Sequence, residues 1–294
     1  MPFCAALAAL AALEAGLILF AGPDAGLPAP AAASSPAYTP TAMSYGGWAA
    51  GYLADAPAGQ AFTAIATTFR LPAAGPVPQT AGGAATTNGW VSLWAGIGIE
   101  AHGGSLMQAG ISMHAGPGGW DLAAPWWINE PRTPTAPHAL GFGARPGDLI
   151  QVLVQETDAA DSVWTFTISD LTSGAHDEGI CYRCIADGST AAWVEEDPLS
   201  GSEPAQFADP GLLDFVSASA ALGGGTLQPL GQAPDWRPLI RTVGALGTYA
   251  PLPGQLPTAS AAATNPGHQG AAQGPLLPAP GAGGGFLLGE LQSA

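Results

Sequence analysis

Short strand-like segments, repeated along the middle of the chain, constrain the fold more than any other feature of the sequence. Each is rich in β-branched and aromatic residues, and clusters of Gly, Pro, Asp and Ser separate the segments at roughly ten-residue spacing. This spacing is typical of an all-β antiparallel sandwich or barrel. The expected strands are 62–71, 90–99, 106–113, 120–128, 149–156, 162–169, 191–196 and 212–218.

The segment 162–169 shows the clearest alternation. Trp164, Phe166 and Ile168 fall on one face of an extended chain, and two threonines fall on the other. Beyond the N-terminal segment, no stretch repeats its apolar residues with the 3.6-residue period of a helix. We therefore expect little helix.

The first 20 residues are apolar and rich in Ala and Leu, which is typical of a secretory signal peptide. Two features differ from that pattern, since no Lys or Arg precedes the apolar run and Glu14 interrupts it. The alternative is a single membrane anchor, although this run barely reaches the roughly 17 residues that a span needs. We expect a signal peptide at 1–22 and hence a secreted, extracellular protein, with a linker or short pro-segment at 23–43.

One domain is expected over residues 44–257, because all-β sandwiches often exceed 200 residues as a single unit. Residues 258–294 form an Ala-, Gly- and Pro-rich low-complexity tail, of which 258–285 are expected to be disordered. Within this tail, residues 286–291 fit either a closing strand or a frayed end.

Charge excludes several kinds of partner. The formal net charge is −16, and all six basic residues are Arg. A nucleic-acid-binding protein needs a basic surface, and so does a protein that docks on anionic lipid. We therefore expect neither nucleic-acid binding nor stable membrane association. The acidity fits adaptation to low pH, where carboxylates are protonated and self-repulsion falls, but it equally fits a GC-rich genome that depletes Lys.

Motifs for other catalytic classes are missing from the sequence. It contains no HExxH, no GxSxG and no pair of Asp-Thr/Ser-Gly triplets. Cys181 and Cys184 form a lone CxxC pair, which favours a short disulfide that closes a loop rather than a zinc site. We expect no metal and no cofactor. The histidines are scattered, at His102, His114, His138, His176 and His268.

Two polar sites interrupt strand-like apolar surroundings. Alternation puts Gln108 on one face with small or polar residues, while Met107 and Ile111 take the opposite, core-like face. The same alternation sends Glu195 and Glu196 to opposite faces of their strand. On pattern alone, these residues are compatible with a cleft, but the solvated face of an ordinary antiparallel sheet is the favoured interpretation.

Several blocks over residues 45–220 occur together in the order in which one known family carries them. This ordered set resembles the glutamic peptidases, or eqolisins, which are acid endopeptidases. The blocks are WAAGY at 48–52, FTAIATTFRLP at 62–72, LWAGIG at 93–98, SLMQAG at 105–110, PWWINEP at 125–131, ARPGDLIQVLV at 144–154, WTFTISDLTSG at 164–174, WVEEDP at 193–198 and FADPGLLDFVSASA at 207–220.

The resemblance implies a two-sheet antiparallel β-sandwich of the concanavalin A-like or jelly-roll type, with Gln108 and Glu196 as the catalytic pair. The Glu of such a pair activates a water, and the Gln amide stabilises the oxyanion. Glu196 is chosen over Glu195 because it lies three residues after Trp193. The resemblance further implies polypeptide substrates, a monomer and insensitivity to pepstatin.

Trp94 and Trp127 are candidates for walls of a peptide-binding cleft, with core packing as the alternative for each.

The chain departs from the family pattern at two positions. Gly98 stands where the family usually has Asp, and Ile128 stands where it usually has Glu. In the family, both carboxylates are thought to shape the cleft or support the catalytic pair. Their loss leaves three consequences open, which are altered specificity, lower activity, or an inactive homologue that binds peptide or glycan.

Overall fold

The computed structural model describes residues 48–76, 88–98, 105–130, 137–200, 203–204, 206–230, 236–242, 248–252 and 286–291. The expected signal peptide at 1–22, the linker at 23–43 and most of the tail at 258–294 lie outside these residues. Among the residues described, no helix has the length and apolar character that crossing a membrane requires.

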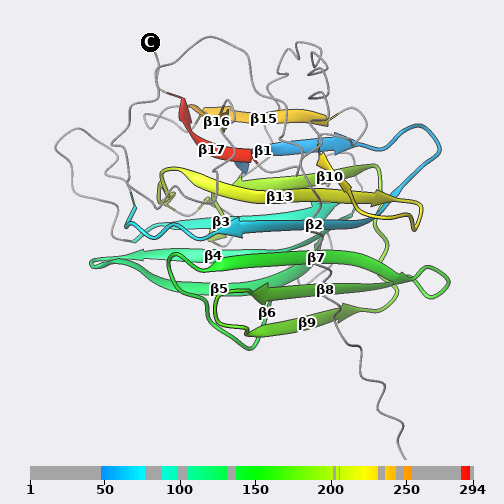
Figure 1. The fold of residues 1–294 in the computed structure, drawn as a ribbon, viewed down its shortest axis with the longest axis horizontal. Coiled ribbons are helices and arrows are strands. Elements are labelled where there is room, and N and C mark those ends of the chain that lie inside the picture. The colour runs from blue at the N-terminus through cyan, green and yellow to red at the C-terminus, as the bar shows by residue number, and fades with distance from the viewer. Residues whose placement is uncertain are drawn as a thin grey trace, which may run out of the picture. The chain divides into compact units, whose positions relative to one another are not determined.

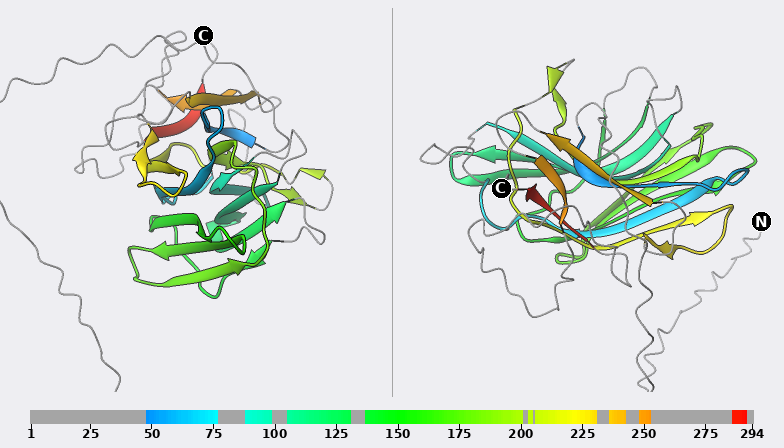
Figure 2. Two further views of the ribbon diagram at one scale, coloured as in Figure 1. Left: turned by 90° about the vertical axis from the view of Figure 1, so that its right-hand side faces the viewer. Right: turned by 90° about the horizontal axis from the view of Figure 1, so that it is seen from above.

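Two antiparallel layers of strands make up the fold (Figures 1 and 2). The predicted two-sheet β-sandwich is therefore confirmed. One layer has the order β6-β5-β4-β3-β10-β1, and the other has the order β13-β2-β7-β8-β9. The strands of the first layer are β1 (Trp48–Asp55), β3 (Trp90–Ile97), β4 (Leu106–Gly116), β5 (Gly119–Glu130), β6 (His138–Ala139) and β10 (Thr190–Glu196). Those of the second are β2 (Phe62–Arg70), β7 (Leu149–Asp158), β8 (Val163–Asp170), β9 (His176–Cys181) and β13 (Leu213–Leu222).

Strands from the C-terminal part of the chain join the two layers at one edge. β15 (Trp236–Thr242) pairs with β1, and β16 (Thr248–Leu252) pairs with β15. β17 (Phe286–Leu291) pairs with both β16 and β13, so it links this edge to the second layer. Residues 286–291 thus form a strand of the sandwich. Smaller strands are β11 (Leu199–Ser200), β12 (Glu203–Pro204) and β14 (Gln228–Pro229).

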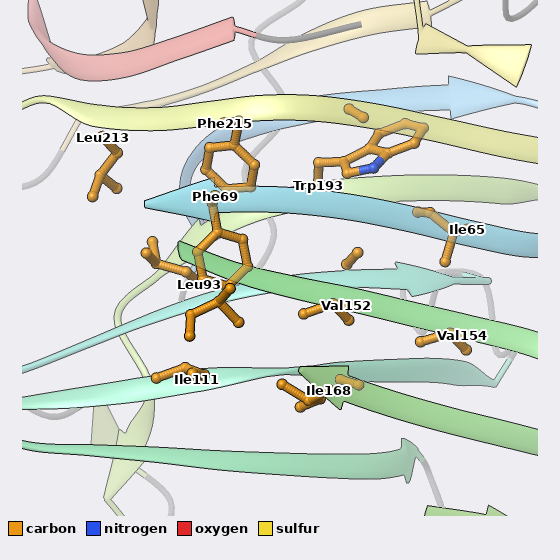
Figure 3. Close-up of a cluster of buried hydrophobic side chains, with 14 of the residues drawn as sticks. Ile65, Phe69, Leu93, Ile111, Val152, Val154, Ile168, Trp193, Leu213 and Phe215 are labelled. Atoms are coloured by element: carbon orange, nitrogen blue, oxygen red, sulfur yellow. The ribbon is translucent and has the colours of Figure 1, made fainter. Parts of the chain in front are cut away.

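The main hydrophobic core lies between the layers (Figure 3). Phe69 of β2 and Phe215 of β13 meet at a ring-centroid distance of 5.5 Å. On β8, Phe166 and Ile168 are fully buried on the face that alternation assigned to the core. Burying each such large apolar side chain contributes about 1.5–3 kcal/mol. The alternation seen in the sequence therefore sets which side of each strand holds the sandwich together.

A disulfide closes the loop between β9 and β10. Cys181 and Cys184 are bonded, with their Cα atoms 5.8 Å apart. The short disulfide favoured by the CxxC spacing is confirmed.

Candidate active site

β4 carries Gln108 on the face that points away from the core. Its neighbours Met107 and Ala109 belong to the main core between the layers. Strand geometry then directs Gln108, Gly110 and Ser112 to the opposite side. Gln108 is 5 % exposed, and its Oε1 has no hydrogen-bond partner among the described residues. Burying an amide oxygen without a hydrogen-bond partner costs free energy, so its presence here fits a group that binds a ligand.

Glu196 lies on this same face, two strands away. β3 pairs with both β4 and β10, so it runs between them. Glu196 is opposite Ser92, and Ser92 is opposite Ser112, whose hydroxyl lies 2.6 Å from the Ser92 hydroxyl. Residues opposite one another in antiparallel strands share a face. The sheet therefore presents Gln108 and Glu196 to one surface.

The two residues are staggered along the strands. Gln108 is opposite Gly96, whereas Glu196 is at the level of Ser112. The four residues from Gln108 to Ser112 span about 13 Å at the usual rise of a strand. To act on one substrate, the two side chains must therefore extend toward each other along the strands. The side chains between them must also leave room for a substrate.

Trp94 occupies the surface between the pair. Its indole Nε1 donates a hydrogen bond of 2.7 Å to Glu196 Oε2. Trp94 is fully buried and meets Trp48 edge to face at 5.0 Å. It belongs to a second apolar cluster on this face, separate from the main core. Because the ring is held on several sides, its N–H fixes the orientation of the Glu196 carboxylate.

Glycines leave room beside Gln108. A Cβ at Gly96 would lie 2.9 Å from Gln108 Cβ and 2.8 Å from the Met107 carbonyl oxygen. A Cβ at Gly110 would lie 2.5 Å from Trp94 Cβ. Both approaches are closer than real Cβ contacts, so any larger residue would displace Gln108 or Trp94. The sequence keeps this part of the surface free of bulk.

Glu195 faces the other way. It is opposite Leu93, which is part of the main core, and it is fully buried. Among the described residues, neither carboxylate oxygen of Glu195 has a hydrogen-bond partner. Burial first, and then the charge of Asp209, raises the pKa of Glu195 well above its usual range. A protonated carboxyl inside the core cannot act on a substrate at the surface.

Comparison with protein families identifies the chain. The model of the peptidase A4 family matches residues 47–235, which is more than half of the sequence. The chain belongs to the peptidase A4 family. These are the glutamic peptidases, or eqolisins, so the resemblance carried by the sequence blocks is confirmed. Membership supports a glutamic-type peptidase, a hydrolase that acts on polypeptides.

Solved structures with a similar fold are glutamic peptidases. Scytalido-glutamic peptidase with a peptide-based transition state analog is 16 % identical, with a TM-score of 0.56, over 83 % of this chain and 98 % of the other. The same peptidase with a transition state analog inhibitor is 18 % identical, with a TM-score of 0.55, over 72 % and 95 % of the two chains. At this identity the likeness shows the fold alone. No curated protein matches the sequence.

The two departures from the A4 peptidase pattern have different structural settings. Gly98 has a φ of 93°, a left-handed conformation that favours glycine, and a Cβ there would meet the Ser105 carbonyl oxygen. An Asp at Gly98 therefore does not fit this backbone. Ile128 is opposite Gln108 and is buried in the second apolar cluster. The residue facing Gln108 across β4 and β5 is thus apolar, which explains why Gln108 Oε1 finds no partner there.

The two candidate tryptophans lie on opposite faces of the sheet. Trp94 is on the face of Gln108 and contacts Glu196 directly. Trp127 is opposite Ala109 on the core face, where it stacks on Phe166 at 4.6 Å. Its position fits the core-packing alternative, and not a wall of the surface that carries Gln108. The difference arises because β5 pairs Ile128, and not Trp127, with Gln108.

Sequence reasoning did not single out His114 and Ser92 as part of this surface. Alternation places both residues on this face. His114 continues the series Gln108, Gly110 and Ser112 along β4, and Ser92 is opposite Ser112. Within the described ranges, no group of three or more His, Cys, Asp or Glu residues could hold a metal ion.

Proposed function

We propose that this A4 peptidase is a secreted acid endopeptidase in which Glu196 activates a water and Gln108 stabilises the oxyanion. The observation that carries the proposal is the shared face of Gln108 and Glu196, with the Trp94 indole bonded to the Glu196 carboxylate between them. A base and an oxyanion donor must act on one carbonyl, and the shared face of Gln108 and Glu196 supports that role for the pair.

The chemistry needs only these side chains and a water. The Glu196 carboxylate takes a proton from the water, whose oxygen then attacks the scissile carbonyl carbon. The negative charge that develops on the carbonyl oxygen accepts a hydrogen bond from the Gln108 amide. One such donor is worth about 3–4 kcal/mol. The proton on Glu196 then passes to the leaving nitrogen, and the C–N bond breaks.

Acid conditions suit both members of the pair. An ordinary Glu carboxyl titrates near 4.3, so a Glu stays partly ionised, and can act as a base, down to a little below that pH. A Gln amide is neutral and donates at any pH. The formal net charge of −16 would fall as carboxylates protonate, which also favours a compact fold in acid. Secretion is proposed from the apolar N-terminal segment, and a monomer insensitive to pepstatin from the family resemblance.

An alternative function has one observation in its favour. Ile128 puts an apolar side chain beside Gln108 where the family usually has Glu. Without that carboxylate, the same surface would bind a peptide or glycan without cleaving it. Retention of both Gln108 and Glu196 on one face favours the peptidase.

Cleavage of a denatured protein tests the proposal. The purified chain should cleave near pH 3 in the presence of pepstatin, with activity falling toward pH 7. Gln108→Ala should lower kcat/KM by about 10²–10³-fold, because the oxyanion loses its donor. Gln151→Ala is the matched control, since Gln151 is exposed on β7 of the other layer. Full activity in Gln108→Ala would sink the assignment, and glycan or peptide binding without cleavage would support the alternative.

A further inference from the structure

The surroundings of Gln108 are apolar, and the proposed mechanism makes no use of this. Ile128 of β5 is opposite Gln108, and Leu106 lies on the same face of β4. On the other side Gly96 is opposite Gln108, and a Cβ there would lie 2.9 Å from Gln108 Cβ and 3.1 Å from Leu106 Cδ1. The Cβ atoms of opposite residues are about 4.5–5.5 Å apart, so a substrate group held by Gln108 also meets Ile128.

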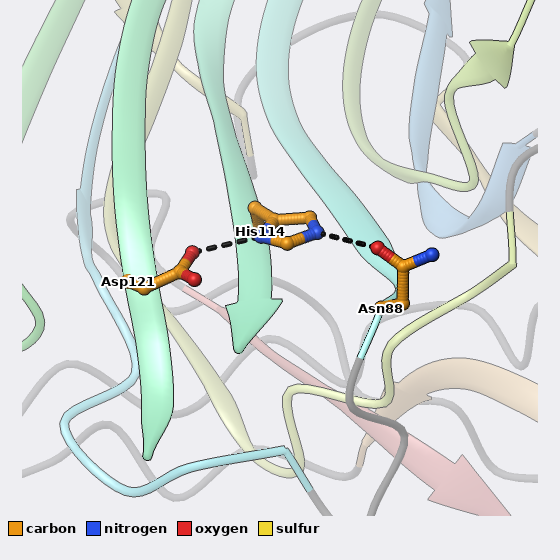
Figure 4. A network of polar contacts seen from close by, with 3 residues as sticks. All are labelled: Asn88, His114 and Asp121. Carbon is orange, nitrogen blue, oxygen red and sulfur yellow. Dashed lines mark hydrogen bonds and ion pairs between the residues drawn. The ribbon is translucent and has the colours of Figure 1, made fainter. Parts of the chain in front are cut away.

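The charged groups that β4 and β5 carry lie near the ends of these strands. His114 is about 20 Å along β4 from Gln108. Its charge is already paired, because Nδ1 lies 2.8 Å from Asp121 Oδ1, while Nε2 lies 3.1 Å from Asn88 Oδ1 (Figure 4). At the other end lies Glu130, the last residue of β5. The level of Gln108 therefore carries no charged side chain among the described residues of β3, β4 and β5.

Two polar atoms on this face have no hydrogen-bond partner among the described residues, namely Gln108 Oε1 and Trp126 Nε1. The two residues are 5 % and 8 % exposed. Trp126 is opposite Gly110, so it is a diagonal neighbour of Gln108, about 7–8 Å away. One edge of an extended peptide repeats its N–H and C=O groups every second residue, or about 6.6–6.8 Å. An acceptor and a donor at this spacing match the backbone of an extended substrate.

The Gln108 amide offers partners for a single substrate residue. An extended residue presents its N–H and its C=O to the same side, as in a hydrogen-bonded pair of an antiparallel sheet. A side-chain amide carries the complementary donor and acceptor. The NH₂ group of Gln108 is the proposed donor to the cleaved carbonyl, which leaves Oε1 for the N–H of the same substrate residue. The side chain beside Ile128 then belongs to the residue that supplies the cleaved carbonyl.

From this geometry we infer that Ile128 is a specificity-determining residue, which selects a large apolar side chain on the residue that supplies the cleaved carbonyl. The inference rests on the proposed function, because it takes Gln108 as the donor to that carbonyl. A polar side chain is disfavoured there, since neither Ile128 nor Leu106 replaces the hydrogen bonds that it loses on leaving water.

Peptides that differ in one side chain test the inference. Fluorogenic peptides carry Leu, the near-isosteric Asn, or Lys at each of the three positions before the cleaved bond, which mass spectrometry of the products locates. At the position next to that bond, kcat/KM at pH 4 should be at least about ten-fold higher for Leu than for Asn. A Leu/Asn ratio near one overturns the inference. A preference for Lys also overturns it, because that result indicates recognition by a carboxylate such as Glu130.

Two variants of Ile128 separate specificity from stability. Ile128→Gln should bring the Leu/Asn ratio to within about three-fold of one. The matched control Ile180→Gln, 44 % exposed on β9 of the other layer, should keep the wild-type ratio. Ile128→Ala leaves space beside Gln108, so the ratio of kcat/KM for Phe to that for Leu should rise by about three-fold or more. Unchanged ratios, or an equal loss of kcat/KM for all peptides, overturn the inference, because they indicate a structural role.

Failure of the proposed function would look different. If the wild-type chain cleaves none of these peptides, calorimetry compares its affinities for the Leu and Asn peptides. Tighter binding of the Leu peptide that disappears in Ile128→Gln supports the apolar subsite, in a protein that binds peptide without cleaving it. Equal affinities overturn the inference.

Discussion

Glu195 and Glu196 are adjacent and chemically identical, yet the two faces of β10 give them opposite environments. Glu196 lies half-buried on the outer face and accepts a hydrogen bond from Trp94. Glu195 lies in the core, fully buried, and neither of its oxygens has a hydrogen-bond partner in the part of the chain that the structure describes. The comparison teaches that a carboxylate becomes a candidate base through its face and its neighbours, and not through its residue type.

The same contrast extends to the tryptophans of neighbouring strands. Trp94 directs its indole N–H at a carboxylate on the outer face. Trp193 is equally buried, but its Nε1 donates to the Ala66 carbonyl oxygen in the opposite layer, at 3.0 Å. On the outer face the Trp94 indole therefore orients the Glu196 carboxylate. On the core face the Trp193 indole links the two layers.

The largest effect is expected when the two glutamates are replaced by Gln, one in each variant. Glu196→Gln should lower kcat/KM by about 10²–10⁴-fold, because the proposed general base is lost. Glu195→Gln should leave the activity of the folded protein within a few-fold of wild type. Hydrolysis of a denatured protein at pH 3 measures both variants. Loss of activity in Glu195→Gln, and not in Glu196→Gln, would contradict the contrast between the two glutamates.

The pH dependence of stability should report on Glu195. Its raised pKa means that the folded state binds this proton more tightly than the unfolded state. The stabilisation is complete below the unfolded pKa, about 4.3, and is lost as the pH rises toward the folded pKa. The loss should approach about 1.4 kcal/mol per pH unit for this one group.

Urea unfolding between pH 4 and 7 tests this prediction. Glu195→Gln should flatten the decline in the free energy of unfolding, and Glu178→Gln, at an exposed position on β9, should not. Asp214 adds a smaller decline in both variants, because burial raises its pKa as well. A wild-type protein that becomes more stable toward pH 7 would contradict the burial of Glu195.

The tryptophan pair should separate activity from stability. Trp94→Phe removes the donor to Glu196 and should lower kcat/KM by about ten-fold or more, as expected for a hydrogen bond to a charged group. Trp193→Phe should lower the free energy of unfolding by about 1–3 kcal/mol while the folded fraction keeps its activity. Equal losses of kcat/KM in both variants would show that the outer-face bond has no special role.

The smallest effect is expected at the disulfide. The bond between Cys181 and Cys184 closes a loop of only four residues, so its loss should cost about 2 kcal/mol of stability. The double change to Ser should leave kcat/KM close to the wild-type value, because Cys181 and Cys184 belong to the core face. A strong loss of activity would indicate that the loop after β9 contributes to the outer face.

Strands with strong alternation were predictable from the sequence. β7 and β8 begin and end within two residues of the expected segments, because apolar residues there repeat every second position. β9 was not predicted, since its sequence HDEGIC has few apolar residues. A signal was present in Gly179, because a glycine within a strand often marks a close approach. Here the Trp127 indole packs against it, and a Cβ would overlap the ring.

The sequence by itself determined the central strands other than β9 and the face of each residue in them, because side-chain direction in a strand alternates locally with the chain. That was enough to set Gln108 apart from the core and Glu195 apart from Glu196. Only the tertiary structure decided that β3 runs between β4 and β10, that Trp94 bonds Glu196, and that Trp127 meets Phe166. Strand pairing and register depend on packing summed over the whole sandwich, so no single segment encodes them.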